Sequence, residues 1–388
     1  MPATIPWSSL IGTVIRARFI DRPNRFLIRC EGPDGQRLLA HLPNPGRLWE
    51  LLLPGVTVLL RPAVSRARQP RKTRFSVLAV ERDGVPILQD TQLSNEVARR
   101  LIEGGRIPSL RGAAIVRREV TAGRSRFDFL MRDGSGEFLL EVKSVTLFGN
   151  GVAMFPDAPT ARGRRHLLEL AAAPAARGAT RPTVLFLVHS SRIRELRPDY
   201  HTDLPFARTL LELRPKLRII VAAIGWRRAL GLPRKVTELL IPWDPVGREA
   251  ADRGAYLLIL RLPRRRLVEV GRLGRLPFAR GYWIYVGSAM QNLDARIARH
   301  LRLTKQHRWH IDYLRRVAAE ARGVPIRSSA RLECALAEAL GAIMASGPRG
   351  FGCSDCHCPT HLFYSAEPPL ARADFIAVLQ AFRMPPAL

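Results

Sequence analysis

A pair of strand-like segments joined by a turn constrains the fold of this chain more than any other stretch. Residues 127–131 alternate apolar side chains with others, which is the two-residue period of a strand. The sequence Asp-Gly-Ser-Gly at 133–136 is typical of a tight turn, and residues 138–145 read as a second strand. The sequence therefore predicts a hairpin, and a helix carrying His166 follows it.

Three charged residues on this hairpin point to a catalytic site. Asp128 lies on the first strand and Glu141 on the second, so antiparallel pairing could bring their carboxylates together. Lys143 follows Glu141 by two residues and therefore projects from the same face. Two carboxylates can hold Mg²⁺ or Mn²⁺, which polarises a phosphoryl oxygen and activates water while a lysine supports the developing charge. The alternative is a solvated face, because such a spacing also arises by chance.

The charge balance favours a polyanionic partner. The chain has 388 residues, enough for two or three domains, with 62 basic against 33 acidic residues and a net charge of +29. Most of the basic residues are arginine, for which the base composition of the genome is the alternative explanation. Neutralising phosphates releases condensed counterions, so we expect nucleic acid (DNA or RNA) as the partner. The sequence identifies no protein partner.

The start of the sequence, its apolar runs and its cysteines indicate the cellular compartment. Its first residues lack a basic segment ahead of an apolar core, and no apolar run approaches the roughly 20 residues of a spanning helix. The five cysteines, three of them clustered, do not resemble a secreted disulfide framework. We therefore expect a cytoplasmic protein that does not act at a membrane.

Residues 1–85 are expected to form a first domain, an OB-like β-barrel. Turn signals separate short strand-like runs at 13–19, 25–30, 37–41, 56–61 and 75–81. Such barrels often bind single strands in basic grooves, although a small barrel can also be only a packing module. A basic loop before the last run would contact a nucleic-acid backbone, or else be merely solvated: Arg66, Arg68, Arg71, Lys72 and Arg74.

Residues 86–245 are expected to form a second domain, an α/β sandwich with a mixed sheet. The order of helices and strands supports this fold class. Helices are predicted at 91–104, 160–173 and 203–213, and strands at 114–120, 126–131, 136–145, 183–188 and 217–224.

Residues 1 to about 245 resemble the sugar fermentation stimulation protein family, whose members pair an OB-like domain with a PD-(D/E)xK nuclease core. Four segments carry the resemblance. They are Leu-Pro-Asn-Pro-Gly at 42–46, Ser-Arg-Phe-Asp-Phe at 125–129, Glu-Val-Lys-Ser-Val-Thr-Leu at 141–147, and Phe-Pro-Asp-Ala at 155–158 with Arg162-Gly163 and His166-Leu167.

The resemblance implies a metal-dependent nuclease. Asp128 and Glu141 would hold the metal, Lys143 would assist catalysis and Arg126 would contact nucleic acid. Glu119, one strand earlier, is either a further acid or an exposed strand residue. Family members are described both as nucleases and as DNA-binding regulators of sugar catabolism, so a non-catalytic regulator is the competing hypothesis.

Residues 246–388 are expected to form a third domain after a linker signal, Pro-Trp-Asp-Pro-Val-Gly at 242–247. The chain at 261–280 is basic and rich in turn residues. Gly-Ala-Tyr at 254–256 and Tyr-Val-Gly at 285–287 resemble the paired tripeptides of the α/β GIY-YIG nuclease domain. Three further segments are similar to an uncharacterised branch of that superfamily: Trp-His-Ile-Asp-Tyr at 309–313, Leu-Glu-Cys at 332–334 and Gly-Phe-Gly-Cys-Ser-Asp-Cys at 350–356. Strands are predicted at 254–260 and 281–288, and helices at 292–303 and 328–344.

This second resemblance implies another catalytic site. Tyr256 and Tyr285 would lie together, one activating water, while Arg296 binds phosphate and Glu333 ligates a divalent metal. His300 lies four residues after Arg296, hence on the same helix face, and would also contact nucleic acid. Taken singly, the tyrosines could instead be packing residues and the basic pair a solvated face. The asparagine that some such nucleases carry late in the domain has no clear equivalent here.

A cluster of thiols near the end of the chain suggests zinc. Cys353, Cys356, Cys358 and His361 form the pattern C-x₂-C-x-C-x₂-H, and four such ligands suit a tetrahedral Zn²⁺ site. His357 is an alternative ligand. The competing interpretation is a cysteine-bearing loop that packs beside the catalytic face.

Overall fold

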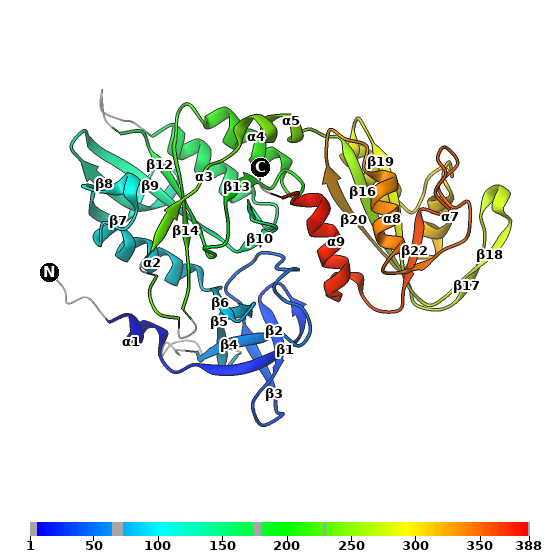
Figure 1. Cartoon of the computed structure of the whole chain (residues 1–388), viewed down its shortest axis with the longest axis horizontal. Coiled ribbons are helices and arrows are strands. Elements are labelled where there is room, and N and C mark those ends of the chain that lie inside the picture. The colour runs from blue at the N-terminus through cyan, green and yellow to red at the C-terminus, as the bar shows by residue number, and fades with distance from the viewer. Residues whose placement is uncertain (1–5, 64–72, 174–179, 228–229, 234, 387–388) are drawn as a thin grey trace. The chain divides into compact units, whose positions relative to one another are not determined.

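The computed structural model describes residues 6–63, 73–173, 180–227, 230–233 and 235–386 (Figure 1). The chain divides into two compact units. Unit 1 holds the chain up to Asp199 together with Pro205–Trp243, and unit 2 holds Tyr200–Leu204 and Asp244–Pro385. Among the described residues, every helix is too short or too polar to cross a membrane.

Unit 1 begins with a short helix and a closed barrel, which confirms the OB-like prediction. Strands pair in the order β3-β2-β1-β4-β5-β6, and a parallel pairing between β3 and β5 closes the barrel. Strand β6 was not predicted from the sequence. It pairs with β5 and adds one strand at the end of the barrel sheet. The elements are α1 (Trp7–Ile11), β1 (Ile15–Asn24), β2 (Leu27–Glu31), β3 (Arg37–His41), β4 (Thr57–Pro62), β5 (Phe75–Arg82) and β6 (Val85–Leu88).

The rest of unit 1 is an α/β core around a mixed sheet of order β15-β14-β12-β9-β8-β7, as predicted. Strands β9, β12 and β14 run parallel, whereas β7 and β8 form antiparallel pairs at one side. The elements are α2 (Thr91–Glu103), β7 (Ala114–Ala122), β8 (Ser125–Asp133), β9 (Gly136–Val145), α3 (Ala161–Ala171), β12 (Thr183–Val188), α4 (Leu204–Leu213), β14 (Arg218–Ile224) and β15 (Val236–Glu238).

A smaller sheet of order β10-β11-β13 lies beside this core and was missed from the sequence. Its strands, β10 (Leu147–Gly149), β11 (Val152–Phe155) and β13 (Glu195–Pro198), are only three or four residues long. Such short runs show no usable period, and β13 contains charged residues that read as loop. The pairing of β11 with β13 is parallel, so only the folded chain brings them together.

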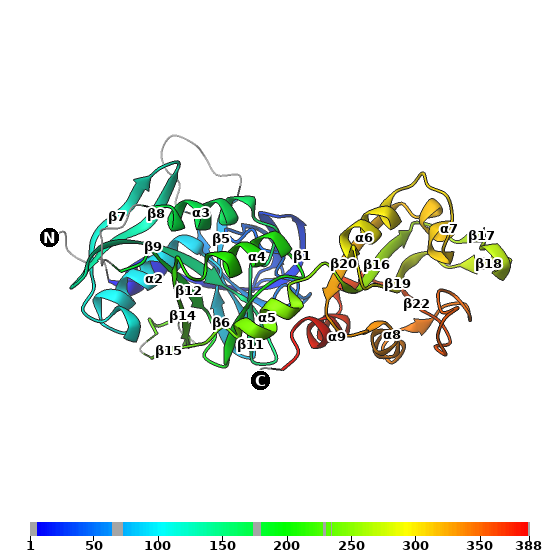
Figure 2. The same cartoon turned by 90° about the horizontal axis from the view of Figure 1, so that it is seen from above.

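Helices cover both faces of the main sheet (Figure 2). Along β12, Val184 and Phe186 pack in the same apolar cluster as Leu167 of α3. The intervening Leu185 packs in the cluster that contains Val97 of α2. Successive strand residues point to opposite faces, so a strand covered on both faces is apolar throughout, as β12 is.

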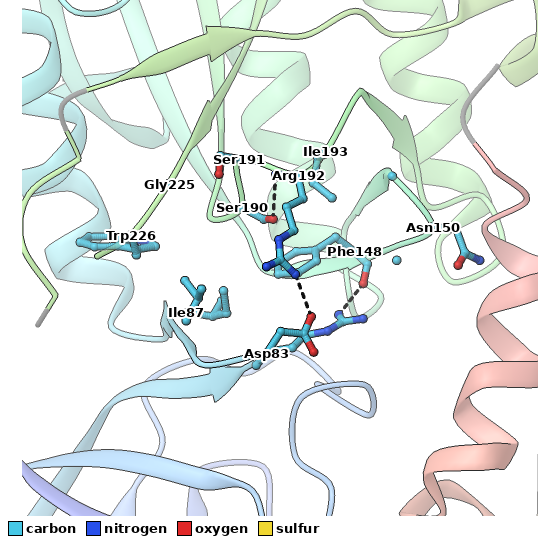
Figure 3. Close-up of a pocket in the computed structure, with 14 residues that line it drawn as sticks. Asp83, Ile87, Phe148, Asn150, Ser190, Ser191, Arg192, Ile193, Gly225 and Trp226 are labelled. Atoms are coloured by element: carbon cyan, nitrogen blue, oxygen red, sulfur yellow. Dashed lines mark hydrogen bonds and ion pairs between the residues drawn. The ribbon is translucent and has the colours of Figure 1, made fainter. Parts of the chain in front are cut away.

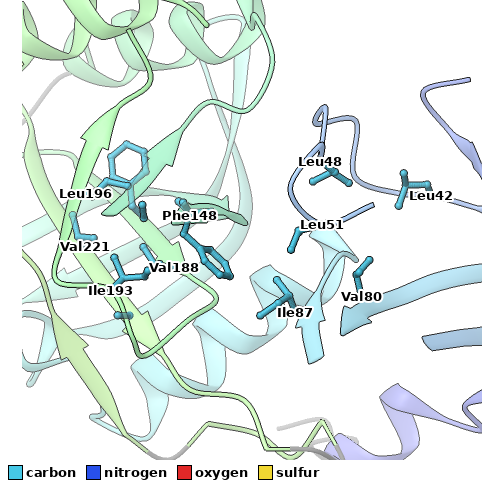
Figure 4. Packing of buried hydrophobic residues seen from close by; sticks show 14 of the residues in the cluster. Leu42, Leu48, Leu51, Val80, Ile87, Phe148, Val188, Ile193, Leu196 and Val221 are labelled. Carbon is cyan, nitrogen blue, oxygen red and sulfur yellow. The ribbon is translucent and has the colours of Figure 1, made fainter. Parts of the chain in front are cut away.

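The barrel and the core of unit 1 share one apolar cluster. In Figure 4, Ile87 of the barrel and Phe148 of β10 lie between the barrel residues and those of the core. Arg82 donates a hydrogen bond from Nη1 to the Phe148 carbonyl at 2.6 Å, and its guanidinium lies 5.0 Å from the centre of the Phe148 ring. This contact fixes β10 against the barrel, which matters because β10 follows directly after the catalytic candidates on β9.

Unit 2 is built on an antiparallel sheet of order β20-β16-β19-β22-β21, with a separate β17–β18 hairpin. The predicted α/β class is confirmed. The strands are β16 (Gly254–Leu262), β17 (Arg266–Glu269), β18 (Arg275–Phe278), β19 (Gly281–Ala289), β20 (Glu320–Arg327), β21 (Ala345–Ser346) and β22 (Leu362–Ser365). The helices are α5 (Trp243–Glu249), α6 (Leu293–Leu301), α7 (His310–Val317), α8 (Glu333–Gly341) and α9 (Ala373–Arg383).

Two local details differ from the prediction. The segment expected to be a linker does contain the boundary between the two units, but it also includes the start of helix α5. Its Pro245 stands in the first turn, where a proline is tolerated because the N–H there has no intrahelical partner. The helix predicted from residue 328 begins at Glu333 instead, because the Ser328 N–H still bonds to the Arg253 carbonyl at 3.2 Å.

Candidate active site

A cavity of about 660 Å³ in unit 1 collects the charged residues of the β8–β9 hairpin. Asp128 comes from β8, Glu141 and Lys143 from β9, and His166 from α3. The antiparallel register pairs Phe129 with Leu140, so the neighbouring residues Asp128 and Glu141 lie across from one another. The structure therefore brings together the three residues that the sequence singled out.

Asp128 is fixed by hydrogen bonds to both carboxylate oxygens. Its Oδ1 accepts from Asn95 Nδ2 at 2.6 Å, and its Oδ2 accepts from the Val142 N–H at 2.8 Å. Burial, and then the charge of Glu141, raise the pKa of Asp128 to about 6. At neutral pH the carboxylate is therefore ionised at an energetic cost, which a nearby positive charge would relieve.

Glu141 is almost fully buried, yet it is held as an anion. Its Oε1 accepts from Lys143 Nζ at 2.6 Å and lies 3.0 Å from His166 Nδ1. Burial opposes ionisation, but the hydrogen bond from His166 and the charge of Lys143 outweigh it and hold the pKa of Glu141 below its usual value. The second oxygen, Oε2, is buried without a hydrogen-bond partner among the described residues. A buried carboxylate oxygen in this position is available as a metal ligand.

The position of His166 follows from local contacts of α3. Thr160 caps the helix by accepting the Gly163 N–H at 2.9 Å through Oγ1. One turn further, the His166 ring packs edge-on against Phe127 of β8, with 6.0 Å between ring centres. The helix start thus places the imidazole against Glu141.

Segments distant in the sequence support the cavity wall. Asn44 donates from Nδ2 to Gln89 Oε1 at 3.0 Å and to Thr146 Oγ1 at 3.3 Å. The Leu48 N–H donates to Asp157 Oδ2 at 2.7 Å. Residues 44–46 and 155–158 therefore line the same cavity as the carboxylates. Sequence reasoning did not find Asn95 or assign Asn44 a role, because a polar residue in a helix or a turn carries no distinctive signal.

Basic residues surround the cavity. Arg25, Arg126 and Arg162 line it. Arg126 is exposed, and its Nη1 lies 3.6 Å from the carboxylate of Glu119, which lines the cavity too and is also exposed. Of the predicted basic loop, Arg74 is exposed, whereas Arg66, Arg68, Arg71 and Lys72 lie outside the described residues.

Another cavity of unit 1, of about 210 Å³, has different chemistry (Figure 3). Among the described residues that line it, Asp83 alone carries a carboxylate. That carboxylate lies 3.4 Å from Nη1 of Arg192. This cavity lacks the paired acids that a hard cation favours, so the larger one is the better candidate.

In unit 2, a cavity of about 200 Å³ is lined by Tyr256, Tyr285, Arg296 and Glu333. The two rings lie 6.4 Å apart, one on β16 and one on the adjacent β19. Burial raises the pKa of Tyr256 and of Tyr285 well above the usual value, so both are phenols at neutral pH. They can donate hydrogen bonds here, but neither is poised to accept a proton from water.

Arg296 and Glu333 of this cavity both have partners. Arg296 stacks on Trp309, with 4.7 Å from its guanidinium carbon to the ring centre. Glu333 accepts a hydrogen bond from Ser288 Oγ, and its Oε1 lies 3.3 Å from His361 Nδ1. Burial opposes ionisation of Glu333, but the contact with His361 and the hydrogen bond from Ser288 outweigh it and lower its pKa.

His300 is not placed to contact nucleic acid, contrary to the prediction. The residue is 1% exposed, and its Nδ1 lies 3.2 Å from Oδ1 of Asp312. Asp312 also accepts hydrogen bonds from Arg299 and from the backbone N–H of Arg308. His300 is therefore one part of a buried polar cluster that joins α6 to α7, rather than part of a solvated helix face.

The predicted set of zinc ligands needs one correction. The side chains that converge are Cys334, Cys356, Cys358 and His361, so Cys334 replaces Cys353. Cys353 is buried and follows Gly352, whose backbone packs closely against the Tyr285 ring. The segment at Cys353 thus belongs to the wall of the tyrosine cavity. Neighbouring positions in sequence suggested Cys353, whereas Cys334 is supplied by a helix that only the fold brings near.

Comparisons with known families divide the chain into three matched regions. Residues 20–88 match the SfsA N-terminal OB domain, and residues 92–225 match the sugar fermentation stimulation protein RE domain. Residues 255–384 match a domain of unknown function, DUF123. Its description names no activity, so the GIY-YIG resemblance of this region stays a prediction.

Similar proteins match more than half of the chain. A sugar fermentation stimulation protein homolog of Methanothermobacter thermautotrophicus is 42% identical over 201 residues, which are 52% of this chain and 81% of that protein. A homolog of Chloroflexus aurantiacus is 41% identical over 213 residues, 55% of this chain and 80% of that protein. The structure of Pyrococcus furiosus SfsA in complex with Ca²⁺ is 29% identical, with a TM-score of 0.51, and the match covers 59% of this chain and 96% of that one. On these similarities, together with the barrel and the mixed-sheet core, the chain belongs to the sugar fermentation stimulation protein family, with a DUF123 domain following in the same polypeptide.

Proposed function

We propose that unit 1 is a nuclease that hydrolyses phosphodiester bonds with a divalent cation, Mg²⁺ or Mn²⁺, held by Asp128 and Glu141. The observation that carries this proposal is the buried Oε2 of Glu141, which has no hydrogen-bond partner among the described residues. It lies in the same cavity as a second carboxylate whose pKa is raised to about 6. Two adjacent buried carboxylates cost free energy unless a cation joins them.

The donor set fits a hard divalent cation. Carboxylate oxygens are the ligands that Mg²⁺ and Ca²⁺ prefer, and the related Pyrococcus furiosus protein forms a complex with Ca²⁺. When bound, such a cation polarises a phosphoryl oxygen and lowers the pKa of a coordinated water. A purely structural carboxylate pair would be expected to have hydrogen bonds to all of its oxygens, which Glu141 lacks among the described residues.

Other side chains of unit 1 have separate tasks. His166 and Lys143 fix Glu141 through its Oε1, while Oε2 has no hydrogen-bond partner among the described residues. The ammonium group of Lys143 also supplies positive charge beside the place where a phosphate would gain negative charge. Asn95 orients Asp128.

Nucleic acid is the substrate class that the rest of unit 1 supports. Arg25, Arg126 and Arg162 line the cavity and can contact phosphates on either side of the reacting one. The net charge of +29 favours polyanions, and OB barrels commonly bind single strands. These features favour DNA or RNA over a small phosphorylated metabolite.

The test is metal-dependent cleavage by the whole purified chain. Labelled single-stranded DNA, duplex DNA and RNA are incubated with Mg²⁺ or Mn²⁺, or with a chelator. We expect cleavage of at least one substrate, lost with the chelator and in Asp128→Asn and Glu141→Gln. Glu137→Gln is the matched control, because Glu137 lies on the same strand but is exposed and paired with Arg132.

The competing function is a non-catalytic, DNA-binding regulator of sugar catabolism. The same experiment decides between the two. If the folded wild type binds DNA but cleaves none of the substrates with either metal, the regulator is favoured and the nuclease proposal fails. Cleavage that persists in Glu141→Gln would place the activity elsewhere in the chain.

A further inference from the structure

The four metal-binding side chains of unit 2 lie at distances that suit one ion. Their ligand atoms, one from each of Cys334, Cys356, Cys358 and His361, are all within 4.8 Å of one another. The Sγ of Cys356 lies 3.4 Å from Nε2 of His361. Ligands about 2.0–2.3 Å from a tetrahedral zinc ion are about 3.5–4 Å apart, so the side chains need only small movements to close around one.

The backbone on both sides of the cluster is already fixed. The His361 N–H donates to the Phe351 carbonyl at 2.9 Å, and the His361 carbonyl accepts from the Val286 N–H at 2.9 Å. Cys334 lies in the first turn of α8, which packs against β19 and β22, and His361 directly precedes β22. The ligands thus come from two separate segments that the sheet of unit 2 holds together.

The orientation of His361 is an independent sign of metal binding. This side chain is 1% exposed, with Nε2 directed to the thiols and Nδ1 lying 3.3 Å from Oε1 of Glu333. A metal-ligating histidine almost always presents its other ring nitrogen to a carboxylate or carbonyl, which fixes the tautomer. The residue beside the ligand Cys334 supplies that carboxylate.

We infer that Cys334, Cys356, Cys358 and His361 bind one structural zinc ion, and that Glu333 orients His361 as its partner. Three thiolates and one imidazole form a closed set for Zn²⁺ and leave no open position for a substrate. The thiols lose their protons on binding. The ion would join the start of α8 to the segment before β22 and so hold Glu333 at the tyrosine cavity. This inference does not depend on whether unit 1 cleaves nucleic acid.

The test measures zinc in the untagged whole chain after gel filtration in reductant. We expect one zinc ion per chain in the wild type, as measured by inductively coupled plasma mass spectrometry. Cys334→Ser should lose it, and the exposure of Cys334 makes this substitution harmless to the core. Cys353→Ser and His357→Ala are the matched controls, because both residues are near in sequence but outside the convergent cluster, and both should retain one zinc.

A second measurement does not rely on any variant folding correctly. The wild type is stripped of zinc with a chelator and reloaded with Co²⁺, and we expect strong sulfur-to-cobalt absorption bands at one equivalent. Sub-stoichiometric zinc with no such bands would overturn the inference, as would stoichiometric iron or a disulfide among these thiols. Loss of zinc in Cys353→Ser with retention in Cys334→Ser would show instead that the contiguous C-x₂-C-x-C-x₂-H set binds the ion.

Discussion

The sequence predicts a catalytic site in each unit, but the two cavities differ in which polar atoms lack a hydrogen-bond partner. In unit 1, Asp128 and Glu141 share one cavity, and an oxygen of Glu141 has no hydrogen-bond partner among the described residues. In unit 2, one oxygen of the Glu333 carboxylate accepts a hydrogen bond from Ser288, and the other lies 3.3 Å from Nδ1 of His361. Burial raises the pKa of the two tyrosines beside it still further above neutral pH.

This difference shows why a motif does not by itself identify a working site. In both regions the residue types expected for catalysis lie together, so the sequence pattern alone does not distinguish the two sites. A hard cation requires carboxylate oxygens that are not already satisfied, and general base catalysis requires a group whose pKa lies near the operating pH. Unit 1 has such an oxygen at Glu141, whereas burial moves the pKa of both tyrosines of unit 2 further from neutral pH. The predictions below test that contrast.

The largest effect is expected for Glu141→Gln. Removing the charge that holds the cation should reduce the rate of cleavage at least about 100-fold, because metal and transition-state stabilisation are lost together. Initial rates on the preferred substrate are compared with those of wild type and of Glu137→Gln. A rate within experimental error of wild type would contradict the difference drawn between the two units.

The pH dependence of cation binding should follow Asp128. The pKa of this group is about 6 in the metal-free protein, so protons compete with the cation below that pH. Affinity for Mn²⁺ should fall by about tenfold for each pH unit below 6 and change little above 7. Calorimetric titration at several pH values measures this dependence. A constant affinity down to pH 5 would mean that Asp128 is not a ligand.

Asp128→Asn should change the pH dependence of stability when no metal is present. The folded-state pKa of about 6 lies above the ordinary value, so the folded state binds more protons than the unfolded state between about pH 4 and 6. Wild-type stability contributed by this group therefore falls as pH rises through that window. Asn cannot accept both of the hydrogen bonds that Asp128 accepts, which lowers the variant's stability at every pH, but the variant escapes this pH-dependent loss. Relative to wild type, its free energy of unfolding should therefore be roughly 1–2 kcal/mol more favourable at pH 7.5 than at pH 4.5.

Chemical denaturation in the presence of a chelator, at pH 4.5 and at pH 7.5, measures this change. The variant's free energy of unfolding minus that of wild type should be larger at the higher pH. Equal differences at both values would show that Asp128 does not titrate between them. The same variant should be inactive in cleavage, which separates its effect on stability from its effect on function.

The smallest effect is expected for Tyr256→Phe in unit 2. Its hydroxyl makes no hydrogen bond within the described residues, so the free energy of unfolding should change by less than about 1 kcal/mol. Nucleic-acid cleavage between pH 7 and 9 should keep the same pH profile as wild type. A profile shifted by this substitution would show that the phenol takes part in proton transfer after all.

Much of the fold was accessible from local patterns. Alternation and turn signals located the barrel strands and the β8–β9 hairpin, because each strand has one face against a core and each turn needs particular residues. The two-residue spacing of Glu141 and Lys143 placed them on one face for the same reason. Strands β10, β11 and β13 were missed because their partners lie far along the chain and their own sequences are too short to show a period.

The sequence by itself determined which residues could perform chemistry: the acids and lysine of one hairpin, the paired tyrosines and a group of thiols. Only the tertiary structure decided how deeply each of these side chains is buried and which residues it contacts. In the folded chain one oxygen of Glu141 has no hydrogen-bond partner among the described residues, and His300 is buried against Asp312. The predicted metal ligand Cys353 is replaced by Cys334. The physical reason is that burial and hydrogen bonding depend on contacts between distant segments, whereas a sequence pattern records only the spacing of neighbours.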